Sequence, residues 1–392
     1  MQLEAGMTTL AFLAPINFVG DLLLKFFSPE TVNNFVWPFI QIGLVVTLVA
    51  GWVAYATYLE RKISAFMQAR LGPMRVGPWG LLQPIADAIK LLTKEDFIPD
   101  KADRGIFFLA PYIAVASAFI VMAVVPFAPD WGVIADVNIG ILFVLAVSSV
   151  GVLALILAGW SSNSKYALLG GLRSSAQMVS YEVAMGLSVM GVLMVYSTLD
   201  LQEIARDQGV LIRELLPARL GFLQPVIGWL PAWGVFLQPL AFLLFFTAAV
   251  AETKRIPFDL PEGESELVAG YHVEYSGGKF LMFFAGEFAE VVTAAGLVTT
   301  LFFGGWQVPY LMRDGFHFPW GSIWLLPHLA VVILQVAAFT LKVLFFCWLQ
   351  ILLRWSVPRF RYDQVMRLGW KMMLPLALLN VAVTALIIVA AQ

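Results

Sequence analysis

Five ionisable side chains lie inside, or at the end of, long apolar stretches of this chain. They are Glu182, Glu252, Glu287, Glu290 and Lys342. A charge at the centre of a membrane-spanning helix costs about 2.5 to 3.5 kcal/mol on insertion scales, so such groups usually face a cavity or a partner. Glu287 and Glu290 are three residues apart and share a helix face, and two such carboxylates can hardly both stay ionised in a low dielectric. The spacing therefore predicts that at least one of them carries a proton.

Each of these groups also has a purely structural interpretation. A neighbouring opposite charge would then neutralise it, and the group would have no role in transport. For Glu182 and Glu287, which lie deep in apolar runs, the proton-carrying interpretation is favoured. For Lys342, and for Glu252 near the expected membrane interface, the structural one is favoured.

An acidic segment follows the apolar run that ends at Glu252. From Glu252 to Glu274 there are six acids and two bases, a balance of -4. A solvated acidic loop is the ordinary explanation of such a composition. The acids, however, alternate with apolar residues such as Phe258 and Leu260 and with two prolines. A packed loop, whose carboxyl groups have raised and coupled pKa values suited to passing protons, is the alternative. Composition alone leaves both open.

The stretch from Arg70 to Lys90 contains two Gly-Pro turns and then an amphipathic pattern. Apolar residues share one helical face from Leu81 onward, namely Leu82, Ile85, Ile89 and Leu92. Asp87 and Lys90 project elsewhere. The pattern predicts a helix lying in the membrane interface. Such a helix could wall a headgroup-depth entrance for an amphiphile, or it could simply be attracted to anionic lipid.

The elements that position these groups are apolar runs of about 20 residues, the length that spans about 30 Å of hydrocarbon as a helix. The 392-residue chain is 60% hydrophobic and 13% charged, as expected for a membrane protein. The runs are continuous, which excludes barrel strands. They are expected at roughly 38–58, 106–126, 140–160, 177–196, 233–252, 280–303, 324–352 and 370–390. The predicted fold is an all-α polytopic membrane protein with eight transmembrane helices plus interfacial amphipathic helices.

Basic residues are distributed unevenly between the two sets of loops. In or at the edge of loops 59–105, 161–176, 253–279 and 354–369 there are 18 Lys and Arg residues, against 5 in the opposite set. The positive-inside rule makes the first set cytoplasmic and both termini periplasmic. Residues 1–37 are expected to form an N-terminal interfacial helix before the transmembrane domain, 38–392, with a ninth span as the alternative. The length and the absence of a transit-type N-terminus favour a bacterial inner membrane.

Cysteine and histidine usage argues against bound metal. The chain has one cysteine and three scattered histidines, with no spacing typical of a metal or haem site. We therefore expect no iron–sulfur cluster, haem or structural zinc in this chain. There is also no basic, aromatic-interleaved surface for nucleic acid.

Several long motifs resemble the signature stretches of the NuoH family, the quinone-site membrane subunits of complex I-type NADH:quinone oxidoreductases. They are 59–62, 70–90, 159–173, 180–182 and 251–276, and they occur in order along roughly residues 38–390. The resemblance implies a non-redox subunit with no activity alone. It implies that the chain forms a tunnel for a quinone, ubiquinone or menaquinone, and couples quinone reduction to proton translocation through buried acids. FMN and the iron–sulfur clusters would belong to partner subunits.

The resemblance also implies roles for individual residues. The quinone tunnel would include Glu60, Arg61, Asp87, Lys90, Phe258 and Arg354. The proton relay would consist of Glu182, Glu252, Glu262, Glu264, Glu266 and Glu287. Structural ion pairs are expected at Arg173 and Asp259. The implied partners are hydrophilic quinone-site and cluster-bearing subunits, small membrane subunits, antiporter-like subunits and membrane lipids.

The chain departs from the family pattern at three positions. Gly263 stands where alanine is usual, Phe288 replaces a usual tyrosine, and Glu290 adds an acid where a neutral polar residue is commoner. Our hypothesis is that Glu290 is an extra proton site.

Other classes of membrane protein fit the sequence less well. A related subunit of a membrane-bound hydrogenase is the alternative, but the matches through 70–90 and the acidic loop favour the quinone-reducing branch. A free-standing antiporter predicts inverted repeats, and none is evident. A passive anchor gives no reason for acids within 177–196 and 280–303.

Overall fold

The computed structural model describes residues 31, 36–129, 132–215, 228–260, 263, 267–312, 314–318 and 321–391. Long helices dominate, which confirms the predicted all-α polytopic membrane fold. Within these residues, six helical segments are long and apolar enough to cross a membrane. They are α6 (Arg104–Met122), α7 (Gly140–Ser161), α8 (Lys165–Tyr196), α15 (Gly277–Phe302), α16 (His328–Ser356) and the continuous segment Tyr362–Ala390. That last segment joins α17 (Tyr362–Arg367), the π-helical η5 (Leu368–Met373) and α18 (Leu374–Ala391).

The other two predicted spans also fall on helices. The run 38–58 lies within α4 (Trp37–Met67). The run 233–252 is divided between α12 (Gly234–Leu237) and α13 (Pro239–Glu252), because Gln238 is not helical and Pro239 cannot donate to the preceding turn. With 14 residues, α13 is about 21 Å long, less than the thickness of the hydrocarbon layer. The total of eight spans stays a prediction.

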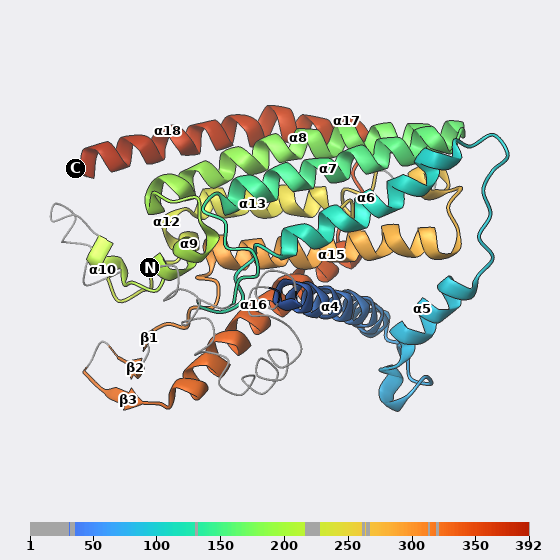
Figure 1. Ribbon diagram of the computed structural model, residues 1–392. Helices are drawn as coiled ribbons and strands as arrows, with labels where there is room; N and C mark the ends of the chain where they lie inside the picture. Colours follow the sequence, from blue (N-terminus) through green and yellow to red (C-terminus); the bar gives the residue numbers. More distant parts are fainter. Residues whose placement is uncertain are drawn as a thin grey trace.

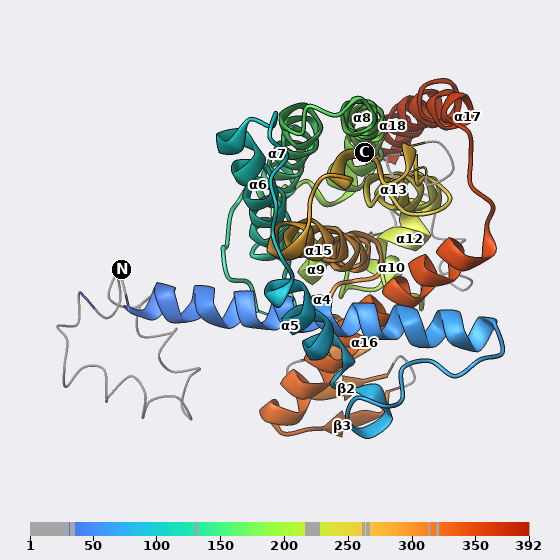
Figure 2. The ribbon, with the colours of Figure 1, turned by 90° about the vertical axis from the view of Figure 1, so that its right-hand side faces the viewer.

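Most of the long helices run side by side. In Figure 1, α6, α7, α8, α15 and α18 lie roughly parallel, with α13 packed among them. Two helices are inclined to this bundle. In Figure 2, which looks toward one end of the bundle, α4 lies across the view beside α15 and α16. The buried core between the helices is rich in small apolar residues such as Ala248, Ala289 and Val298, which allow close approach of helix backbones.

Shorter elements lie at the two ends of the bundle. At one end are η2 (Pro78–Gly80) and α5 (Gln83–Thr93), and η4 (Gly270–His272) packs against α7 and α8. At the other end are α9 (Leu201–Asp207), α10 (Ile212–Leu215) and a small antiparallel sheet (Figure 1). The sheet has the order β1 (Leu311–Met312), β2 (Gly315–His317), β3 (Ile323–Leu325).

The predicted interfacial helices have different outcomes. The helix expected from Leu81 is present as α5, and its apolar residues Ile85, Ile89 and Leu92 are exposed. An exposed apolar face on a short helix is typical of a segment that lies on a membrane or a partner. The expected N-terminal interfacial helix falls almost entirely outside the described residues.

Candidate functional site

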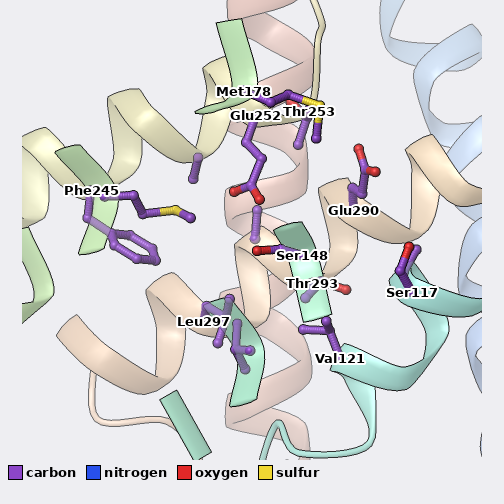
Figure 3. Close-up of a pocket in the computed structure, with 15 residues that line it drawn as sticks. Ser117, Val121, Ser148, Met178, Phe245, Glu252, Thr253, Glu290, Thr293 and Leu297 are labelled. Carbon is purple, nitrogen blue, oxygen red and sulfur yellow. The ribbon is translucent and has the colours of Figure 1, made fainter. Parts of the chain in front are cut away.

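Helices α6, α7, α8, α13 and α15 line a cavity of about 50 Å³. This volume has room for a few water molecules. Polar side chains line it together with apolar ones, and they are Ser117, Ser148, Glu252, Thr253, Glu290 and Thr293. Figure 3 shows Glu252 pointing toward Ser148, with Glu290 projecting from the neighbouring helix. The cavity is thus a polar space between two acids that the sequence placed on separate helices.

Glu182 is linked to this cavity through α7. It accepts hydrogen bonds from Ser148 at 3.2 Å and from Ser149 at 3.0 and 3.1 Å. Ser148 also lines the cavity that Glu252 faces. Because a hydroxyl group both accepts and donates, Ser148 connects Glu182 with the cavity.

A second, smaller cavity of about 10 Å³ lies beside the first. Its polar lining consists of Lys254, Tyr271, Glu287 and Glu290. Glu287 and Glu290 therefore share a helix face, as their spacing predicted, and Glu290 borders both cavities. The Tyr271 hydroxyl group donates to Glu287 at 2.7 Å. The acids Glu182, Glu252, Glu290 and Glu287 thus border a continuous series of hydroxyl groups and cavities.

A buried cation lies within this acidic cluster. The ammonium group of Lys254 is 3.1 Å from Glu290 Oε2 and 3.3 Å from Oε1. Burial alone would lower the pKa of Lys254, but the carboxylates of Glu290, Glu287 and Glu252 outweigh that effect and raise it. Lys254 is therefore charged at neutral pH. Burial lowers the pKa of the nearby His272, so that its imidazole is neutral at pH 7.

A second charged cluster surrounds Glu60 on α4. Glu60 is buried and accepts from Arg255 at 2.8 Å and from Arg354 at 2.5 Å. The next residue of α4, Arg61, forms an ion pair with Asp87 of α5. The structure thereby brings together four of the six residues expected in the quinone tunnel.

The remaining two expected tunnel residues lie in different surroundings. Phe258 is buried, with its ring centroid 5.4 Å from that of Tyr181 and 5.5 Å from that of Phe360. Lys90 is exposed on α5. Their placement leaves the tunnel assignment of both residues a prediction.

The two charged clusters meet at adjacent residues of one loop. Lys254 pairs with Glu290, whereas Arg255 pairs with Glu60 and lies with its guanidinium carbon 4.0 Å from the ring centroid of Phe288. The side chain of Gln177 on α8 holds this loop by donating to the carbonyl oxygens of Ala251 and Phe258, both at 2.8 Å.

Comparison with known proteins identifies the family. Residues 40–385 match the family model described as NADH dehydrogenase. The chain belongs to the NADH dehydrogenase family. It is 45% identical over 368 residues to the NADH-quinone oxidoreductase H subunit 2 of Geobacter metallireducens, covering 89% of this chain and 94% of the relative. It is 47% identical over 353 residues to the NADH-quinone oxidoreductase subunit 8 of Rhodothermus marinus, covering 89% and 96%.

A third bacterial relative covers still more of the chain. The NADH-quinone oxidoreductase H subunit of Bdellovibrio bacteriovorus is 42% identical over 387 residues, which is 92% of this chain and 97% of the relative. The resemblance to the NuoH subunits of complex I, read from the motifs, is thus confirmed. This member of the NADH dehydrogenase family is a membrane subunit of a bacterial oxidoreductase complex.

Several predicted residues of this family member lie outside the two clusters. Asp259 is buried and forms an ion pair with Arg359 at 2.6 Å. Arg173 is half-buried on α8, and its ion pair stays a prediction. Glu262, Glu264 and Glu266 fall outside the described residues. Around them the acidic loop is packed, because Phe258, Leu260 and Leu267 are buried.

Lys342 lies apart from the acids. Its ammonium group donates to the carbonyl oxygens of Phe303 at 2.7 Å, Gly305 at 3.0 Å and Gln307 at 2.7 Å. These carbonyls follow the C-terminus of α15, where a positive charge is favourable. The geometry therefore agrees with a structural role for Lys342.

Sequence reasoning missed Ser148, Ser149, Tyr271 and Lys254 as parts of this site. Ser148 and Ser149 were a pair of small polar residues in an otherwise apolar run, which was a weak signal. Lys254 had been counted only as one basic loop residue. Its position two residues after Glu252 was the signal that could have identified it.

Proposed function

We propose that this chain lines part of the quinone tunnel of an NADH:quinone oxidoreductase and couples quinone reduction to proton translocation through its buried acids. The observation that carries the proposal is the adjacency of Lys254 and Arg255. Arg255 pairs with Glu60 in the expected tunnel, and Lys254 pairs with Glu290 in the acidic cluster. A change of charge or position at Glu60 therefore reaches the acids through one peptide unit.

The chemistry of the acidic cluster suits proton transfer. Proton transfer needs donor and acceptor within hydrogen-bond reach, directly or through one water. Ser148 bridges Glu182 to the larger cavity, and that cavity, with room for water, lies between Glu252 and Glu290. The smaller cavity continues from Glu290 to Glu287. A proton can pass along this series of groups without crossing apolar packing.

In this proposal the chain carries no redox centre and has no activity alone. Its relatives are named NADH-quinone oxidoreductase subunits, and FMN and the iron–sulfur clusters belong to partner subunits that reduce the quinone. The chain supplies the walls of the tunnel and the electrostatic coupling. Its partners are those hydrophilic subunits, small membrane subunits and antiporter-like subunits, and its loops 59–105 and 253–279 face the cytoplasm.

The test is Glu252→Gln in the complete complex, with assembly checked by native gel. NADH:quinone reductase activity and proton pumping are measured in membrane vesicles. The substitution keeps the shape of the side chain but removes its ability to lose a proton, so pumping is expected to fall at least about tenfold, as for other groups that transfer protons.

The matched control is Glu203→Gln. Glu203 is exposed on α9, away from the cavities, so this variant is expected to pump normally. An assembled Glu252→Gln complex that pumps as many protons per NADH as the control would refute the relay.

A further inference from the structure

Lys254 lies at the junction of the two cavities. Its side chain is 4% exposed, and its structural partner Glu290 borders both cavities. Glu287 shares the smaller cavity with Lys254, and Glu252 borders the larger one. Three carboxyl groups thus surround one buried ammonium group.

Most of the other polar groups facing this cluster are engaged in bonds of their own. Arg255 pairs with Glu60, and the Tyr271 hydroxyl group donates to Glu287. From α7, Ser148 and Ser149 donate to Glu182. From α6, Ser117 donates to the carbonyl oxygen of Ala114 within its own helix. His272 is neutral at pH 7 because burial lowers its pKa.

Buried carboxylates need a counter-charge, because removing an ion from water costs several kcal/mol unless it is paired. The three acids carry up to three negative charges, and the ammonium group of Lys254 can balance one at a time. A lysine has a flexible four-carbon stem and three rotatable donors. It can therefore change partner without a movement of the backbone.

We propose that Lys254 is the mobile counter-ion of the relay, which pairs with Glu290 while that acid is ionised and with Glu252 or Glu287 while Glu290 holds a proton. When a proton passes from Glu252 to Glu290, one carboxyl group becomes ionised and the other becomes neutral. The total charge is unchanged, and Lys254 keeps its three protons. The cation follows the negative charge and so reduces the cost of each transfer.

This inference rests on the proposed function, and it also gives the extra acid a role. Glu290 stands where a neutral polar residue is commoner in the family, and it bonds to Lys254. The pair forms one unit: the acid is the intermediate proton site, and the lysine is its exchangeable partner.

The experiment compares Lys254→Gln, Lys254→Arg and the double variant Lys254→Gln/Glu290→Gln in the complete complex. Protons pumped per NADH oxidised are measured in vesicles from mildly acidic to mildly alkaline pH. Lys254→Gln is expected to reduce pumping at least about tenfold, the scale of a lost proton-transfer group. Lys254→Arg, which keeps the charge, is expected to stay within about threefold of the unaltered complex. Lys371→Gln, which removes an exposed charge, is the control.

The double variant separates a switching cation from a purely structural pair. Removing both charges leaves no unpaired ion, so the complex is expected to assemble even if Lys254→Gln alone does not. A mobile counter-ion predicts that the assembled double variant still pumps poorly, with an altered pH profile. Normal pumping with an unaltered profile, in the double variant or in Lys254→Gln, would overturn the inference.

Failure of this inference can be told from failure of the proposed function. If Glu252→Gln abolishes pumping and Lys254→Gln does not, the relay stands and Lys254 is only structural. If Glu252→Gln pumps normally, the relay itself is refuted.

Discussion

Arg255 and Glu60 form a buried ion pair across 195 residues of sequence, with a nitrogen–oxygen distance of 2.8 Å. Their side chains are only 8% and 9% exposed. The pair joins α4 to the loop after α13, which also carries Lys254. Any event that alters Glu60 therefore acts on the loop that borders the acids.

The variant Glu60→Gln tests this junction. It leaves Arg255 and Arg354 without a carboxylate in a buried site, and breaking a buried pair in this way costs about 3 to 5 kcal/mol. We expect lower thermal stability of the complex and a higher KM for quinone. The control is Asp363→Asn, which removes an exposed ion pair with Arg361 and is expected to change stability by less than about 1 kcal/mol. Equal stability and equal kinetics in the two variants would contradict the assignment.

The position of η4 depends on the close contact between Gly170 and Gly270. A Cβ atom on Gly170 would lie 2.6 Å from the Cα atom of Gly270, so Gly170→Ala forces η4 away from α8. Tyr271 lies in η4, and its hydrogen bond to Glu287 is then expected to weaken. Overpacking of this kind costs about 1 to 3 kcal/mol.

The measurement for Gly170→Ala is pumping per NADH in assembled complexes, together with thermal stability. Gly186→Ala is the matched control in the same helix, because the nearest side-chain atom to its Cβ, on Leu145, would be 3.7 Å away. Both quantities are expected to fall in the first variant only. If the two variants behave alike, the close contact does not position Tyr271.

Lys342 distinguishes a structural cation from a proton carrier. Lys342→Met removes the donor to three carbonyl oxygens after α15, and a hydrogen bond to a charged group is worth about 1.5 to 3 kcal/mol. Thermal stability is expected to fall by at least about 2 kcal/mol, while protons pumped per NADH stay unchanged. Unchanged stability with reduced pumping would instead make Lys342 part of a proton path.

The sequence was sufficient for the parts of the fold that depend on local pattern. Apolar length located the long helices, and the spacing of Glu287 and Glu290 correctly placed both on one face. Helix α13 was harder, because the apolar run 233–252 continues through Gln238 and Pro239, where the helix breaks.

The candidate site was less predictable because its pairings are long-range. Ser148 meets Glu182 across 34 residues, and Lys254 meets Glu290 across 36. A buried lysine in a loop also has the same sequence signature as an exposed one. Only the packing of α8, α13 and α15 shows that Lys254 is enclosed by acids.

The most direct test of the proton relay is Glu182→Gln in the complete complex, with assembly verified by native gel. Glu182 is connected to the cavity through Ser148, so a glutamine, which cannot release a proton, is expected to interrupt the relay. Quinone reductase activity and proton pumping are measured in the same vesicles. We predict that both fall at least about tenfold in a fully assembled complex; normal pumping in that complex would contradict the relay.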